Sequence, residues 1–236
     1  MTYKNTEGLD ALLSNKNFNI IIHPKPDPDT LKKLIENVDG VLIRSEVKIT
    51  ADVIKSARRL KIIARAGTGV DNVDVKEATQ NGIAVINVPG GNTIAACEHT
   101  MALILATARN IPRAYQSLKQ HKWEREKFIG MELLGKTIGL IGFGRIAREV
   151  AERCKSFGMK VMAFDPYITA DFARATNITM VSSVDEIFQS ADVISVHVPL
   201  NDSTRNTINK DAISKMKDGA IVINTARGAI INAADV

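Results

Sequence analysis

The sequence predicts an α/β protein with two doubly wound modules, each built on a parallel sheet. Short runs of β-branched residues alternate with amphipathic stretches of helical length, which is typical of βαβ units. The runs are continuously apolar, as expected for strands that are buried on both faces of a sheet. The alternation stops at Pro89-Gly90-Gly91 and later restarts, which indicates a boundary between modules near residue 90.

The first module is predicted from four apolar runs and the helices between them. Asp27 and Thr50 are typical N-cap residues, and Asn81 followed by Gly82 is a typical helix end. The expected strands are Ile20–Ile22, Val41–Ile43, Ile62–Ala64 and Ala84–Ile86, and the expected helices are Pro28–Glu36, Ala51–Ala57 and Val73–Gln80.

A long apolar helix and a polar connector precede the second module. The helix is expected over Ile94–Ala108, and Pro112 limits its extension. Residues Gln116–Met131 are polar, show little periodicity and include the only tryptophan, so we expect an arm there. The second module is expected to have strands at Thr137–Ile141, Val161–Phe164, Val193–Val196 and Ala220–Asn224, and helices at Arg145–Phe157, Val184–Ser190 and Lys210–Lys215.

Composition excludes several classes of protein. The 236 residues are 45% hydrophobic and 24% charged, which is typical of a soluble globular protein. The net charge of +5 is scattered, so it predicts no nucleic-acid surface. The longest apolar stretch, Met101–Ala108, is far shorter than the ~20 residues that cross a bilayer. Cys97 and Cys154 have neither disulfide nor metal-ligand spacing, which indicates a reducing compartment and no metal site. Together these observations predict a cytoplasmic protein without a membrane or nucleic-acid partner.

The most specific motif is the run Gly142-Phe143-Gly144-Arg145-Ile146-Ala147, a G-x-G-x-x-A dinucleotide fingerprint. An apolar strand enters it and a helix leaves it, which is the context that the fingerprint requires. Gly142 allows the tight turn, and Gly144 lets the backbone approach a pyrophosphate. The small Ala147 lets the helix pack on the strand, and the helix N-terminus offers unpaired N–H groups to the phosphates.

An acidic residue at the end of the next strand completes the pattern. Asp165 lies 23 residues after Gly142, close to the usual spacing of ~20. Its carboxylate would accept hydrogen bonds from the ribose hydroxyls and repel a 2′-phosphate, so NAD is favoured over NADP. The alternative interpretation is a glycine-rich turn with a helix-capping aspartate.

With further motifs in the same order, the chain resembles the D-isomer 2-hydroxyacid dehydrogenases over essentially its whole length. The resemblance implies a flavodoxin-like substrate domain over residues 1–90 and a Rossmann NAD-binding domain over residues 91–236. It also implies oxidation of a 2-hydroxy acid by hydride transfer to NAD. The motifs that carry it are Arg44-Ser45, Ala64–Asp74, Gly91-Asn92, Lys122–Arg125, Phe164–Pro166, Val196–Leu200 and Asn224–Gly228.

The resemblance also assigns site residues. Arg227 matches the catalytic arginine of the family, whose guanidinium can hold a carboxylate and polarise the reacting carbonyl; the alternative is a surface arginine in a turn. The implied cofactor contacts are Thr68, Gly142, Gly144, Arg145, Ile146, Asp165, His197, Val198, Pro199, Thr225, Ala226 and Arg227.

The implied substrate contacts follow strands of the first module. Gly67–Val70 matches the loop that holds the substrate carboxylate, and its glycines allow an anion-binding turn. Arg44 and Arg65 suit a second anion such as a phosphate. The alternatives are a plain strand-to-helix turn, exposed arginines, and a helix N-cap at Asn92. The implied substrate-binding residues are Arg44, Arg65, Gly67, Thr68, Gly69, Val70 and Asn92.

The general base of the family has no counterpart in this sequence. That base is a histidine, oriented by a glutamate, and both follow the arginine motif; no histidine follows His197 here. None of the four histidines, His23, His99, His121 and His197, has a suitable orienting acid in its sequence context, so none is expected to replace this base. We therefore expect a fragment that lacks this segment and its first strand, and that is inactive alone.

Three functions stay open. The first is NAD-dependent oxidation of D-3-phosphoglycerate to 3-phosphohydroxypyruvate in serine biosynthesis, which Arg44 and Arg65 favour. The second is a glyoxylate or hydroxypyruvate reductase, or another D-2-hydroxyacid dehydrogenase. The third is an NAD-binding corepressor or sensor on the same scaffold. The resemblance further implies a homodimer or tetramer through the arm at residues 112–131.

Overall fold

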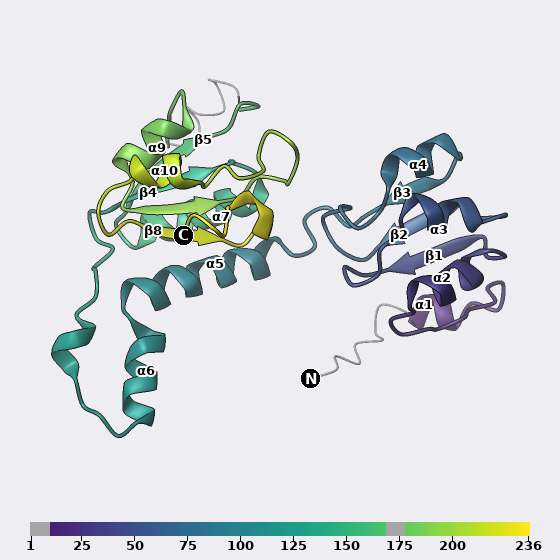
Figure 1. Ribbon diagram of the computed structural model, residues 1–236, viewed down its shortest axis with the longest axis horizontal. Helices are drawn as coiled ribbons and strands as arrows, with labels where there is room; N and C mark the ends of the chain where they lie inside the picture. The colour runs from purple at the N-terminus through teal and green to yellow at the C-terminus, as the bar shows by residue number, and fades with distance from the viewer. Residues whose placement is uncertain (1–9, 169–177) are drawn as a thin grey trace. The chain divides into compact units, whose positions relative to one another are not determined.

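The computed structural model describes residues 10–168 and 178–236, and the chain divides into two compact units, Met1–Val88 and Pro89–Val236. Both units contain a parallel sheet with helices packed on it (Figure 1). The predicted α/β class with parallel sheets is confirmed.

The first unit has a three-stranded parallel sheet of order β1-β2-β3. Its helices α2, α3 and α4 share one apolar cluster with one face of the sheet, where Ile43 and Ile63 are buried. On the other face Leu42, Ile62 and Ile86 are exposed. The elements are β1 (Gly40–Ile43), β2 (Ile62–Arg65), β3 (Ala84–Ile86), α1 (Asp10–Leu13), α2 (Pro28–Ile35), α3 (Ala51–Ser56) and α4 (Val75–Gln80).

Local chemistry explains several of the helix ends in this unit. The Asp27 carboxylate accepts hydrogen bonds from the backbone N–H groups of Asp29 and Thr30 at the start of α2. The hydroxyl and N–H of Thr30 lower the pKa of Asp27. Helix α4 ends before Gly82, whose φ of +68° glycine adopts without strain. Thr50 precedes α3 but, among the described residues, its side chain makes no capping bond, so the predicted side-chain cap is wrong.

Two predicted elements of the first unit need correction. Ile20–Ile22 forms no strand in the described part of the chain, and its three side chains are exposed. The run has strand propensity, but a strand needs a pairing partner, and β1 pairs on one edge with β2. Helix α4 begins at Val75 instead of Val73, because Asp74 is the N-cap and Val73 pairs with Ile49.

The second unit has a five-stranded parallel sheet of order β6-β5-β4-β7-β8, so the winding direction reverses between β4 and β7. This is the order of doubly wound nucleotide-binding sheets. Its strands are β4 (Thr137–Ile141), β5 (Lys160–Phe164), β6 (Thr179–Met180), β7 (Val193–Val196) and β8 (Ile221–Asn224). Its helices are α5 (Thr93–Ala108), α6 (Ile111–Lys119), α7 (Arg145–Ser156), α9 (Val184–Ser190) and α10 (Lys210–Ser214).

Helices cover both faces of this second sheet. Leu140 of β4 belongs to the cluster formed with α5 and α7, whereas its neighbour Ile141 belongs to the cluster formed with α9 and α10. Successive strand residues point to opposite faces, so a continuous apolar run fills both clusters. The short strand β6 was not predicted, because Thr179 and Met180 do not form an apolar run.

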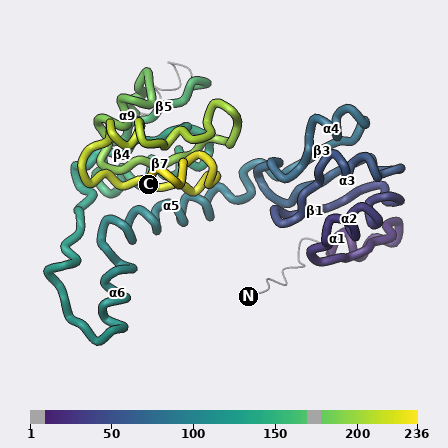
Figure 2. The backbone as a smooth tube through the Cα atoms, in the orientation of Figure 1, coloured from purple at the N-terminus to yellow at the C-terminus, as the bar shows by residue number. Residues whose placement is uncertain are grey.

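The segment after α5 is more ordered than predicted. Pro112 lies in the first turn of a separate helix, α6, where the missing N–H of proline costs nothing. A 3₁₀ turn, Arg125–Phe128, follows. Together these residues project from the sheet of their unit as an arm, defined here as residues 112–131 (Figure 2). Of the helices in the described ranges, none has the length and apolar character needed to cross a bilayer.

Candidate functional site

The glycine-rich turn after β4 is fixed by close packing. Gly142 has a φ of +88°, and a Cβ on it would lie 2.8 Å from Val198 Cγ1 and 2.9 Å from the His197 carbonyl oxygen. A larger residue would therefore be both strained and blocked. The structure thus brings together three predicted cofactor residues where the winding of the sheet reverses, which is where doubly wound sheets bind ligands.

Gly144 differs from Gly142, because the structure around it leaves room for a side chain. It is the N-cap of α7, and a Cβ on it would meet no atom of the described residues within 4 Å. This open space above a helix N-terminus fits the pyrophosphate of a dinucleotide. Ala147 one turn later is fully buried, as the close helix-to-strand packing of the fingerprint requires. Arg145 is exposed at the same helix end, and Ile146 is partly buried against the core.

Asp165 is tied directly to this turn. The Phe143 N–H donates to Asp165 Oδ2 at 2.8 Å, and the Tyr167 N–H donates to Asp165 Oδ1 at 2.9 Å. A carboxylate oxygen accepts more than one hydrogen bond, so both oxygens keep capacity for the hydroxyls of a ribose. The acidic residue that the fingerprint spacing predicts therefore contacts the glycine turn directly.

His197 is held by a partner that the sequence reasoning missed. The fully buried Ser195 places its Oγ 2.9 Å from His197 Nε2, and the His197 N–H donates to the Ile141 carbonyl. Burial lowers the pKa of His197 to about 4, so its imidazole is neutral at pH 7. Two residues later, the Pro199 carbonyl accepts a hydrogen bond from the Thr204 hydroxyl at 2.6 Å.

Arg227 lies on the loop after β8, at the same carboxyl edge of the sheet. Its Nη1 donates to the Ala226 carbonyl at 2.9 Å. The Thr225 hydroxyl lies 2.8 Å from the buried Thr100 hydroxyl of α5. Because Thr100 already donates to the Ala96 carbonyl, Thr225 is the donor in this pair. Thr100 was not predicted, because its partner Thr225 is distant in sequence. Asn224 was not predicted either, because its side chain bonds backbone groups of Ala226 and Arg227.

The predicted substrate loops of the first unit are fastened by asparagine side chains. Asn72 Nδ2 donates to the carbonyls of Arg44 and Val47, at 3.0 and 2.6 Å. Asn87 Nδ2 donates to the Thr68 carbonyl at 2.5 Å. These bonds connect the loops that follow β1, β2 and β3. The carboxyl edge of the sheet therefore carries one cross-linked set of loops, which holds the predicted residues Arg44, Arg65, Gly67, Thr68, Gly69 and Val70.

Arg65 has the chemistry of an anion-binding residue. Its guanidinium lies against Gly67, where any Cβ would collide with it. Its Nε is buried and has no hydrogen-bond partner among the residues that the structure describes. An unsatisfied buried cationic donor is costly, so it suits an anionic ligand. Asn92 belongs to the second unit, at the N-cap position of α5, and its side chain makes no capping bond in the described part of the chain.

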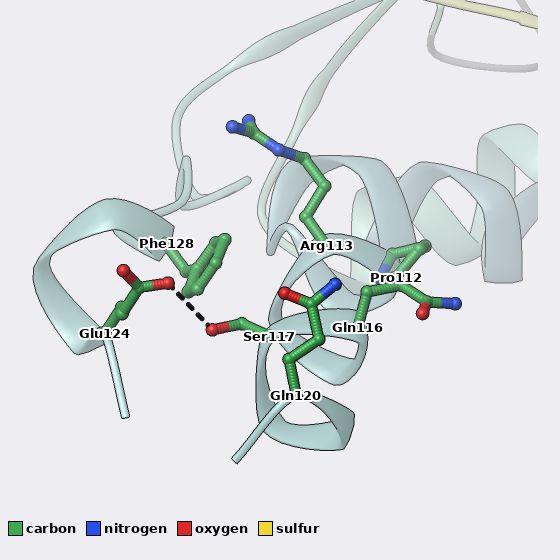
Figure 3. A pocket seen from close by; sticks show the side chains of 7 residues that line it. All are labelled: Pro112, Arg113, Gln116, Ser117, Gln120, Glu124 and Phe128. Atoms are coloured by element: carbon green, nitrogen blue, oxygen red, sulfur yellow. Dashed lines mark hydrogen bonds between the residues drawn. The ribbon is translucent and has the colours of Figure 1, made fainter. Parts of the chain in front are cut away.

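Two surface hollows lie away from these loops. One open hollow of about 390 Å³ is on the arm, where Ser117 Oγ donates to Glu124 at 3.0 Å (Figure 3). Another of similar size lies between α2 and α3 and is lined by Lys32, Lys33, Glu36, Lys55, Ser56 and Arg58. Neither is lined by a predicted site residue. In each unit most of the predicted site residues lie on loops at the carboxyl edge of that unit's own sheet.

Comparison with known proteins bears on these loops. Residues 101–236 match the family model of the NAD-binding domain of D-isomer specific 2-hydroxyacid dehydrogenases. The hydroxypyruvate reductase of Thermotoga maritima is 48% identical over 94% of this chain and 71% of its own length. The D-3-phosphoglycerate dehydrogenase of Archaeoglobus fulgidus is 49% identical over 87% of this chain. The chain covers 39% of the length of that relative.

Solved structures agree with this assignment. The NAD-dependent formate dehydrogenase of Staphylococcus aureus, in complex with NAD, has a TM-score of 0.89 and 33% identity, covering 98% of this chain and 70% of its own. The D-lactate dehydrogenase of Aquifex aeolicus, complexed with NAD and lactic acid, has a TM-score of 0.80 and 31% identity, covering 86% and 61%. The predicted cofactor, NAD, is confirmed at the level of the family. This chain belongs to the D-isomer specific 2-hydroxyacid dehydrogenases and carries their NAD-binding domain.

Proposed function

We propose that this chain supplies the NAD-binding and substrate-binding parts of a dehydrogenase that oxidises D-3-phosphoglycerate to 3-phosphohydroxypyruvate, a step of serine biosynthesis. Residues 1–90 would form the substrate domain, and residues 91–236 the NAD-binding domain. The observation that favours a phosphorylated substrate is the buried, unsatisfied Nε of Arg65 beside Gly67. A second anion next to a carboxylate-binding loop would satisfy it.

In this proposal each loop has one task. The N–H groups of Gly67–Val70 hold the substrate carboxylate, and Arg44 and Arg65 hold the phosphate. Arg227 polarises the reacting oxygen and pairs with the carboxylate. The Gly142 turn and the N-terminus of α7 hold the pyrophosphate, while Asp165 orients the ribose. Bound NAD supplies the hydride acceptor.

The proposal gives no residue of this chain the role of general base. Its only histidine at the carboxyl edge of the second sheet, among the described residues, is His197, which hydrogen-bonds Ser195. A general base contributes roughly 10²–10⁴-fold to such a reaction. We therefore expect the 236-residue chain to bind NADH and to show only trace turnover when it is assayed alone.

Reduction of hydroxypyruvate is the second candidate function. It is favoured by the Thermotoga maritima relative, of whose length this chain covers more than two thirds. The two candidates differ in the phosphate, so they make opposite predictions for Arg65. An NAD-binding sensor is the third candidate, and it predicts NADH binding without selectivity for either acid.

The test uses binding of the two 2-oxo acids to the NADH-loaded chain, measured by NADH fluorescence. Arg65→Ala should lower the affinity for 3-phosphohydroxypyruvate by roughly 30-fold or more, since truncating a desolvated ion pair costs about 2–5 kcal/mol. The affinity for hydroxypyruvate should fall by less than about threefold. Arg59→Ala is the matched control, because Arg59 is an exposed arginine of the same unit that pairs with Asp39 at 2.8 Å.

Equal losses for both acids in Arg65→Ala would contradict the phosphate role and favour the hydroxypyruvate reductase. No binding of either acid by the unmodified chain, together with normal NADH binding, would favour the sensor.

We further propose that the arm forms the interface of a homodimer or tetramer. Tyr115, Leu118, Trp123 and Ile129 on the arm are all more than half exposed, an unusual density of large apolar side chains on one projection. The molar mass from light scattering should be that of a dimer or a larger oligomer. Leu118→Asp should lower this molar mass to that of the monomer. A monomeric unmodified chain would contradict this proposal.

A further inference from the structure

We propose that Asn224 is a positioning residue for Arg227: its side-chain amide sets the loop from which the guanidinium reaches the substrate. This rests on the role proposed above for Arg227. The sequence motif alone does not separate Asn224 from its neighbours. In the structure its side-chain amide both accepts a hydrogen bond from the loop and donates one to it.

The amide of Asn224 makes a hydrogen bond at each end. Its Oδ1 accepts the N–H of Ala226 at 3.0 Å, and its Nδ2 donates to the carbonyl of Arg227 at 2.9 Å. The first bond fixes the peptide group before Ala226, and the second fixes the peptide group after Arg227. One side chain therefore fixes both ends of the two-residue segment that carries the guanidinium.

The guanidinium is held by the segment that Asn224 fixes. Arg227 Nη1 donates to the Ala226 carbonyl at 2.9 Å, so the acceptor of this bond lies between the two anchored peptide groups. A guanidinium recognises a carboxylate through a planar fork, and its plane must be set in advance for both bonds to form. The orientation of the fork thus depends on the geometry that Asn224 imposes.

The base of the loop is fixed independently of this amide. Asn224 ends β8 and pairs with Val196 of β7, and Thr225 is held by Thr100 of α5. Loss of the amide should therefore release only the segment Ala226–Arg227. A positioning group on a rigid strand is what a preorganised site requires.

Only an amide at this position can make both bonds. Asn224→Asp keeps the acceptor for the Ala226 N–H but removes the donor to the Arg227 carbonyl. Asn224→Ser also keeps an acceptor, without adding a charge, so it serves if the aspartate variant does not fold. The matched control is Asn201→Asp: Asn201 Oδ1 accepts from the N–H groups of Ser203 and Thr204, so a carboxylate can replace that acceptor.

The first measurement does not depend on the proposed function. Proton exchange with solvent at Arg227 Nε–H is followed by ¹⁵N NMR, with the signal identified by its loss in Arg227→Lys. We expect exchange about tenfold faster in Asn224→Asp and Asn224→Ser, with midpoints of thermal unfolding close to that of the unmodified chain and no change in Asn201→Asp. Unchanged exchange in both folded Asn224 variants would overturn the proposal.

The second measurement is binding of 3-phosphoglycerate to the NAD-loaded chain. Asn224→Asp should weaken it about tenfold, and the double variant with Arg227→Ala should bind no more weakly than Arg227→Ala alone, because both changes act through one group. Fully additive losses would overturn the proposal. If Arg227→Ala itself has no effect, the proposed function of Arg227 fails, and the exchange measurement still decides whether Asn224 positions it.

Discussion

The two parallel sheets of this chain differ in how far their strands are buried. In the second unit Leu140 and Ile194 are completely buried, because α5 and α7 cover one face and α9 and α10 the other. In the first unit α2, α3 and α4 contribute to one cluster, and Leu42 on the opposite face is 48% exposed. Both sheets are encoded by similar apolar runs. An apolar run therefore predicts a strand, but helices elsewhere in the chain determine how many of its faces are buried.

The candidate sites differ in the same way. In the second unit the Gly142 turn is packed against His197 and Val198, and its Phe143 N–H is bonded to Asp165. In the first unit the loops are joined by the side chains of Asn72 and Asn87 and by backbone hydrogen bonds, such as that from the Val88 N–H to the Gly67 carbonyl. The Gly142 turn is therefore fixed by close packing in addition to hydrogen bonds.

The largest expected effect is in the doubly covered sheet. Leu140→Ala should lower the free energy of unfolding of the second unit by roughly 2–5 kcal/mol, because it leaves a cavity in a fully buried strand. Hydrogen exchange in peptides of β4, β5 and β7 measures the change. An exposed substitution on the same unit, Tyr167→Ala, is the control, because Tyr167 is 90% exposed. A loss under 1 kcal/mol for Leu140→Ala would contradict the burial described here.

The second unit should also lose stability in acid through His197. Its folded pKa of about 4 lies below the unfolded value of about 6.5, so the unfolded chain binds the extra proton first. Stability is therefore full above pH 6.5 and falls as the pH drops towards 4, by up to about 3 kcal/mol. His197→Gln should flatten this part of the pH profile, whereas His99→Gln at an exposed position of α5 should leave it unchanged.

A pH profile that is the same in His197→Gln and in the unmodified chain would mean that His197 is not the group responsible.

The sequence predicts the elements better than it predicts the contacts that fix the site. The glycine turn, Asp165 and the strands that carry them follow from local spacing, so they were predictable. Ser195 and Asn224 were not, because a polar residue in a motif does not reveal which backbone or side-chain group it will face. The same limit applies to Ile20–Ile22, since pairing is a tertiary property, and to α6, where Pro112 begins a helix as readily as it ends one.

Cofactor selectivity should show a smaller effect. Asp165→Asn removes the charge that repels a 2′-phosphate but keeps an oxygen for the Phe143 N–H. We expect the ratio of NADPH to NADH affinity to rise about 10-fold or more, equivalent to roughly 1.4 kcal/mol. Glu152→Gln is the control: it also removes one negative charge, but from the surface of α7, where Glu152 pairs with Lys155. This change should leave the affinity ratio unchanged. An unchanged ratio in Asp165→Asn would contradict the ribose assignment.

The smallest effect is expected on the exposed face of the first sheet. Leu42→Ala should cost at most about 1 kcal/mol, because its side chain is already half in water and its removal creates no closed cavity. Ile43→Ala, the next residue of the same strand, is the matched control: it is 5% exposed and should cost roughly 2–5 kcal/mol. Hydrogen exchange of the β1 peptide gives both values. If Leu42→Ala is as costly as Ile43→Ala, this face is covered in solution, and the contrast between the two sheets disappears.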